Sequence, residues 1–189
     1  MKNDSKYLDN GKFNLLVFRA LEFFIKNPYE EIHLREFSRR LKISPNSAQR
    51  FLNLFLKEGF IIEERKAHLR YFKANLESVV FKSIKKTYSL RELEKSGLID
   101  LLKDKVTHCI LFGSVAKGLD DETSDIDLVC ISNNKNINII KFQDKLNREL
   151  NIHIFNLAEW KKQKQINKAF YQDVIVDGIN LIGEIPIID

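Results

Sequence analysis

The chain has 189 residues, 44% of them hydrophobic, with 14 Phe and three Pro, a composition that supports packed cores and excludes a disordered protein. No apolar run approaches the roughly 18 residues that a membrane span needs, and the first ten residues are polar. We therefore expect no membrane partner, no signal peptide and a cytoplasmic location. Cys109 and Cys130 fall in apolar patterns, so we interpret them as core thiols in a reducing compartment.

Charge divides the chain into two parts of opposite sign. Residues 1–105 carry 22 Lys/Arg and 14 Asp/Glu, a net charge of +8, whereas residues 106–189 carry 9 and 12, a net charge of −3. The length fits one large domain or two small ones, and the asymmetry favours two modules with different partners. The basic module suits nucleic acid, and the acidic module suits a metal ion.

The first part of the chain shows three amphipathic helical patterns followed by two short strands. Ser44 is a suitable N-cap, Pro45 a suitable first helical residue, and Gly59 a suitable C-terminal stop for the third helix. After Gly59 the period changes from helical to alternating, with a turn at residues 66–68. The predicted helices span residues 12–26, 33–41 and 45–58, and the predicted strands span residues 60–65 and 69–73.

Three helices and a basic hairpin over residues 10–75 resemble a winged helix-turn-helix domain. The resemblance implies that the third helix enters a DNA major groove and that the hairpin touches the backbone. A solvated basic face on a dimerisation or protein-docking module is the alternative, so both DNA and a second copy of the chain are expected partners. The residues that the resemblance places on bases are Asn46, Gln49 and Arg50, and those it places on phosphates are Arg65, Lys66, His68 and Arg70.

Residues 76–104 are predicted to form a helical connection. Ser89 is a candidate cap for a second helix within it, and Gly97 breaks the pattern before another apolar stretch. We therefore divide the chain into residues 1–75, 76–104 and 105–189. The last part alternates strands at 106–112, 126–132 and 151–156 with helices at 137–150 and 157–166, an amphipathic segment at 170–176 and a short strand or tail at 179–183.

Two motifs in the last part point to phosphate and metal chemistry. Gly113 and Ser114 form a turn between a buried strand and a short helix, where backbone N–H groups attract phosphate, and Lys117 follows on that helix. Asp125 and Asp127 are two residues apart at the start of a strand, so their carboxylates share one face. Paired carboxylates repel each other without a cation between them, and their oxygens suit Mg²⁺.

The run from Phe112 to Gly118, followed by Ser124 to Leu128, resembles the DNA polymerase β-like nucleotidyltransferase superfamily and its minimal branch. The resemblance implies an α+β fold: a winged helix (three helices plus a β-hairpin), then a small nucleotidyltransferase-type mixed sheet with flanking helices. It also implies that Gly113, Ser114 and Lys117 bind the triphosphate of ATP or another NTP, and that Asp125 and Asp127 bind Mg²⁺ as catalytic ligands.

The third acid of that superfamily is missing. Its expected place holds Asn151, with His153 next on the same face, and Asp144 or Glu149 are the nearest substitutes in sequence. Amide oxygen is a poorer Mg²⁺ ligand than carboxylate, and imidazole prefers softer metals.

Two hypotheses follow: a weakened transferase that moves an NMP to a hydroxyl on a protein, RNA or small molecule, or a DNA-binding transcriptional regulator whose degenerate domain senses a nucleotide. A docking protein without catalysis is a third. Whether the chain is an enzyme stays open.

Overall fold

The computed structural model describes residues 11–184 and 186–187, with side chains from residue 15 onward. The predictions about the first ten residues lie outside this range. The chain forms two compact units, Met1–Phe81 and Lys82–Asp189, and their boundary falls within the helix α4 (Val79–Ser96). In the described part of the chain, no helix has both the length and the apolar character of a membrane span. The predicted domain limits stay a prediction.

The first unit contains the three predicted helices: α1 (Gly11–Lys26), α2 (Leu34–Leu41) and α3 (Pro45–Lys57). The predicted cap of α3 is confirmed, because the Ser47 backbone N–H donates to Ser44 Oγ at 3.1 Å. Aromatic rings hold the helices together. Phe24 lies 5.3 Å from Phe37 and 6.2 Å from Phe55 between ring centroids, and all three are at most 1% exposed.

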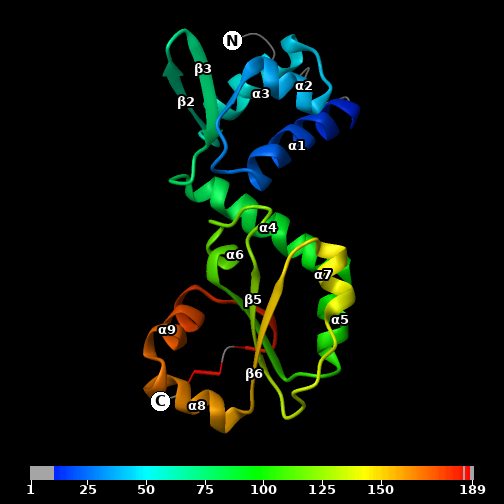
Figure 1. The fold of residues 1–189 in the computed structure, drawn as a ribbon, viewed down its shortest axis with the longest axis vertical. Helices are drawn as coiled ribbons and strands as arrows, with labels where there is room; N and C mark the ends of the chain where they lie inside the picture. The colour runs from blue at the N-terminus through cyan, green and yellow to red at the C-terminus, as the bar shows by residue number, and fades with distance from the viewer. Residues whose placement is uncertain (1–10, 185, 188–189) are drawn as a thin grey trace. The chain divides into compact units, whose positions relative to one another are not determined.

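The predicted hairpin consists of β2 (Ile61–Lys66) and β3 (Leu69–Ala74), which pair antiparallel (Figure 1). The turn is shorter than predicted, because Lys66 still belongs to β2. A two-residue strand, β1 (Ile32–His33), also pairs with β3 and was not predicted, since two residues carry no readable period. His33 therefore lies before α2 and caps it: its Nδ1 accepts a hydrogen bond from the Glu36 N–H at 3.2 Å.

A four-stranded sheet forms the centre of the second unit. Its strands are β4 (His108–Phe112), β5 (Ile126–Ile131), β6 (Leu150–Phe155) and β7 (Ile179–Ile182), in the order β6-β5-β4-β7. β5 and β6 run parallel, and the other neighbours run antiparallel. The sheet is therefore mixed, as predicted, and its parallel pair needs a crossover connection.

Helices cover both faces of this sheet, so alternate residues of β4 and β5 enter two separate cores (Figure 1). Leu111 and Leu128 pack with α4, α5 (Leu98–Lys103), α6 (Gly113–Lys117) and α7 (Ile140–Leu146). Ile110 and Val129 pack with α8 (Leu157–Ile166) and α9 (Lys168–Asp177). The first of these cores also contains the two predicted core thiols, Cys109 and Cys130, which are fully buried and form no disulfide; Cys130 Sγ donates to Cys109 Sγ at 3.6 Å.

Two helix predictions in this unit were wrong. Ser89 caps nothing, because α4 runs through it without a break from Val79 to Ser96. The helix predicted over residues 137–150 is only α7, which ends where Asn147 takes a left-handed conformation (φ 50°) before β6 begins. The predicted break at Gly97 is confirmed by its φ of 81°.

Two glycines of the second unit allow its packing to be tested. A Cβ at Gly118 would lie 2.6 Å from the Lys82 carbonyl oxygen of α4, whereas a Cβ at Gly97 has nothing nearer than 3.9 Å. Both have positive φ, so Gly97→Ala should cost about 1–2 kcal/mol of unfolding free energy from backbone strain. Gly118→Ala should cost about 1–3 kcal/mol more from overpacking. Urea unfolding followed by the fluorescence of Trp160, the chain's one Trp, measures this unit; equal costs would contradict the contact.

Candidate functional site

The Gly113–Ser114 motif and the Asp125–Asp127 motif meet where the end of β4 lies beside the start of β5. Phe112, the last residue of β4, pairs with Asp127, and the chain then turns at Gly113 with φ +73°. A Cβ at position 113 would lie 2.5 Å from Asp127 Oδ2. The glycine is therefore needed because a side chain at position 113 would collide with the Asp127 carboxylate. The sequence predicted another reason for the glycine, the close approach of a ligand.

Asp125 and Asp127 lie on the same side of the strand, as the alternation predicted. Asp125 is exposed just before β5, and Asp127 is half-buried, while the intervening Ile126 is buried. Asn151 is the direct partner of Asp127 on the parallel strand β6. Its Nδ2 donates to Asp125 Oδ2 at 3.2 Å and to Asp127 Oδ1 at 3.3 Å. The structure thus brings these three predicted residues together, with one amide between two carboxylates.

The local ligand set consists of two carboxylates and an amide. Across residues 11–184 and 186–187, no group of three or more His, Cys, Asp or Glu side chains is arranged to hold a metal ion. Asp144 and Glu149 therefore complete no such group. Asn151 turns its Nδ2 toward both carboxylates, so its amide oxygen would become a ligand only after the amide rotates. The two carboxylates by themselves match the donors that Mg²⁺ uses when substrate phosphates supply further oxygens. The repulsion between Asp125 and Asp127 also gives a cation a reason to bind there.

His153 contacts aromatic side chains. Its ring centroid lies 5.9 Å from Phe112 and 5.4 Å from Phe170, and the latter two rings meet edge to face at 5.3 Å. These contacts explain the position of the imidazole without a metal ion. A role for His153 at the third ligand position stays a prediction.

The two other residues predicted for nucleotide binding lie on α6. Ser114 is half-buried in its first turn, and no side chain caps this end of the helix. Lys117 forms an ion pair with Asp173 of α9 and lies 3.5 Å from Asp177 of the same helix. The hydrogen bond to Asp173 raises the pKa of Lys117 above its ordinary value. Contact between Lys117 and a phosphate therefore requires it to leave or share these carboxylates.

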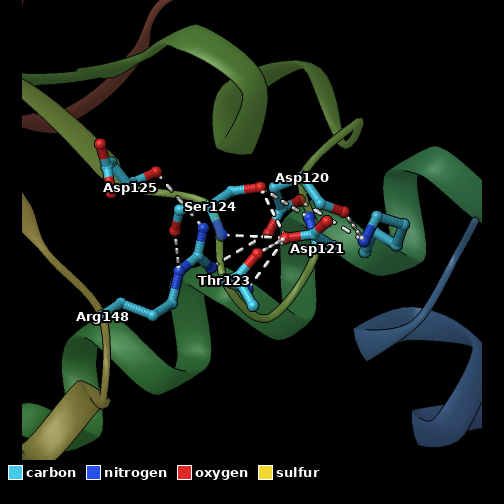
Figure 2. Close-up of polar contacts among 7 residues, drawn as sticks. Asp120, Asp121, Thr123, Ser124, Asp125 and Arg148 are labelled. Atoms are coloured by element: carbon cyan, nitrogen blue, oxygen red, sulfur yellow. Dashed lines mark hydrogen bonds and ion pairs between the residues drawn. The ribbon is translucent and has the colours of Figure 1, made fainter.

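The loop from Leu119 to Ser124 contains polar residues to which the sequence pattern assigned no role (Figure 2). Asp121 Oδ1 accepts hydrogen bonds from the backbone N–H and the hydroxyl of both Thr123 and Ser124, at 2.8–2.9 Å. Burial alone would raise the pKa of Asp121, but these bonds outweigh it and lower the pKa. The tied loop leads directly into Asp125.

The residues predicted to contact nucleic acid divide into two groups. On α3, Asn46 and Arg50 are exposed, and Gln49 donates to Asn53 Oδ1 at 2.9 Å. On the hairpin, the cations meet glutamates. Arg70 makes two hydrogen bonds to Glu63 and lowers the pKa of that carboxyl, Arg65 lies 3.7 Å from Glu63, and Lys66 pairs with Glu31. His68 is exposed at the turn.

Changing Asn151 to Asp tests the electrostatics of the site. The isosteric Asn151→Asp would place a third negative charge where an N–H now donates to two carboxylates. Without a divalent ion, we expect a loss of about 1–3 kcal/mol of unfolding free energy. Millimolar Mg²⁺ should restore the loss by binding the folded state. Thermal unfolding in EDTA and in Mg²⁺ measures both effects. Asn180→Asp on β7, two strands away from β5, is the matched control; an equal response there would contradict a local cause.

Comparison with known proteins agrees with the second unit's motifs. Residues 90–172 match a family model described as a nucleotidyltransferase domain, a span that includes Gly113, Asp125, Asp127 and Asn151. No curated protein sequence matched the chain.

Three solved structures are similar to parts of the chain. Reduced HlyU from Vibrio cholerae N16961 is 15% identical over 39% of this chain and 82% of its own, with a TM-score of 0.31. A toxin–antitoxin structure with AMP-PNP is 24% identical over 48% and 73%, with a TM-score of 0.36. The Thermotoga maritima IclR is 19% identical over 55% and 41%, with a TM-score of 0.33. At such TM-scores these likenesses carry no argument, so the comparisons show one thing, the match of residues 90–172 to the nucleotidyltransferase domain model.

Proposed function

We propose that the second unit transfers an NMP from ATP or another NTP to a hydroxyl on a protein, an RNA or a small molecule, with Mg²⁺. The observation that carries the proposal is the pair of carboxylates, Asp125 and Asp127, joined by the Asn151 amide beside the Gly113 turn. All four residues lie within the segment that matches the nucleotidyltransferase model. A phosphate-accepting turn next to paired acids suits metal-assisted nucleotidyl transfer.

Each residue contributes a separate part of this chemistry. Asp125 and Asp127 would hold Mg²⁺, which, when bound, neutralises charge on the phosphates. Gly113 leaves space for the Asp127 carboxylate next to the turn, which would face the triphosphate. Asn151 keeps the two carboxylates together but adds no charge, so the site carries two negative charges where the related superfamily carries three. We therefore expect slow transfer, since less cation charge is held at the reacting phosphate.

Loss of the carboxylates tests the enzyme directly. The chain is incubated with labelled NTPs, Mg²⁺ or Mn²⁺ and cell extract, and labelled acceptors are resolved by gel electrophoresis. Asp125→Asn and Asp127→Asn should each reduce labelling about 100-fold or more, because each removes a metal-binding charge. Asp100→Asn is the control, since that exposed carboxylate pairs only locally with Lys103 of α5. Labelling that persists in both site variants would contradict transfer at this site.

A DNA-binding regulator that senses a nucleotide is the second candidate. It is favoured by the exposed polar face of α3, where Asn46 and Arg50 follow the Ser44 cap. The hairpin supports it less, because Arg70 and Lys66 are paired with glutamates. If the first unit binds DNA, we expect α3 to supply most of the sequence-reading contacts.

Salt-dependent binding tests this candidate. Full-length protein should bind duplex DNA with an affinity that falls steeply with salt, and Arg50→Ala should weaken binding by about 1–3 kcal/mol. Arg91→Ala is the control, because that exposed arginine lies on α4 in the other unit. Fluorescence anisotropy at several salt concentrations gives both quantities. Equal losses in the two variants would assign binding to net charge alone, and no binding by the wild-type chain would leave docking as the role of this unit.

A further inference from the structure

The second unit buries a pair of opposite charges close to the candidate site. Lys85 of α4 is 1% exposed and Asp120, in the loop before β5, is 4% exposed. Burial of ions is costly, and an apolar pair of similar volume is often at least as stable. Stability alone therefore gives no reason for these charges. Burial lowers the pKa of Lys85, and attraction to Asp120 opposes that shift.

Asp120 is held from two sides (Figure 2). Lys85 Nζ donates to the Asp120 backbone oxygen at 2.8 Å and lies 3.4 Å from its Oδ1. Arg148 Nη1 donates to the other carboxylate oxygen, Oδ2, at 3.0 Å. The loop is thus connected both to α4 and to the chain just before β6. Gly118 adds a close approach of the same loop to α4, at the Lys82 carbonyl.

The Arg148 guanidinium also reaches the backbone at Asp125, one of the two carboxylates of the candidate site. Arg148 Nε donates to the Ser124 backbone oxygen at 2.5 Å, and its Nη2 donates to the Asp125 backbone oxygen at 3.3 Å. The planar fork of an arginine makes these contacts at once, which a lysine ammonium cannot do. Three residues further along, Asn151 contacts both site carboxylates. Arg148 therefore joins the buried carboxylate, the backbone of Asp125 and the start of the strand that carries Asn151.

We infer that the buried pair Lys85 and Asp120 and the half-buried Arg148 form a positioning cluster that holds Asp125 beside Asp127. The inference rests on the proposed function for its effect on metal and nucleotide binding. Its effect on backbone order between residues 124 and 127 does not depend on that function. None of the three side chains is proposed to touch the nucleotide, so they are positioning residues and the Asp125 and Asp127 carboxylates are the groups positioned.

The test is Arg148→Lys in the full chain, with Mn²⁺ alone and Mn²⁺ with ATP as probes. The lysine keeps the charge near Asp120 but loses the fork to Ser124 and Asp125. We expect a melting temperature near that of the wild type, Mn²⁺–ATP binding weakened about tenfold or more, and faster amide hydrogen exchange at residues 124–127. Arg91→Lys, on the exposed face of α4, is the matched control and should change neither binding nor exchange.

A second variant separates positioning from stability. Lys85→Met combined with Asp120→Leu replaces two of the charges by apolar groups and should keep the fold. It leaves Arg148 bonded to the Ser124 and Asp125 backbone but without its carboxylate partner, so we expect weaker Mn²⁺–ATP binding and faster exchange than in the wild type, by less than in Arg148→Lys. If both variants bind and exchange like the wild type, the inference is overturned. If the wild-type chain binds no better than Asp125→Asn, the proposed function fails instead. In that case amide hydrogen exchange at residues 124–127 alone tests the positioning cluster. Faster exchange in the two variants than in the wild type supports the cluster, and unchanged exchange overturns it.

Discussion

Repulsion between two carboxylates on one face of β5 is the constraint around which the second unit is arranged. Asp125 and Asp127 need a partner of opposite polarity, and the Asn151 amide supplies one. That contact is possible because the parallel register of β5 and β6 places Asp127 opposite Asn151. The crossover through α7 is needed because parallel strands cannot be joined by a tight turn. The site therefore depends on the sheet topology, which brings Asn151 beside Asp125 and Asp127.

An amide at the third position changes the balance of charge as well as the ligand count. Two carboxylates attract a divalent ion less strongly than three, and hard cations gain the remaining oxygen ligands from phosphate or water. On the proposed function, the metal would therefore bind chiefly together with the nucleotide. Lys117 of α6 also favours joint binding of metal and nucleotide. It pairs with Asp173 and Asp177 of α9, and only a more strongly charged partner such as a phosphate would draw it away.

Sequence predicts best what depends on neighbours along the chain. The side-by-side placement of Asp125 and Asp127 follows from strand alternation, whereas Asn151 was expected from the superfamily resemblance, which places the third ligand on the strand after the next helix. The positioning cluster was not predicted, because Lys85, Asp120 and Arg148 are separated by 28 to 63 positions and their burial is decided by packing. One local signal existed: Lys85 lies one helical turn after the buried Phe81, on the side of α4 expected to be apolar. Such a lysine indicates a buried acid elsewhere in the chain without identifying it.

The basic first part shows a different gap, because a net charge says nothing of where the charges lie. The net charge of +8 over residues 1–105 already subtracts Glu31 and Glu63, and the structure adds that these two glutamates lie beside the hairpin cations Lys66 and Arg70. Exposed pairs of this kind add little stability, since solvent screens them. Their consequence is electrostatic: a phosphate approaching the hairpin meets paired glutamates as well as Arg70 and Lys66. On the second candidate function, the exposed face of α3 would therefore contribute more to the attraction of nucleic acid than the hairpin does, and Arg50→Ala is a more informative test than the total charge.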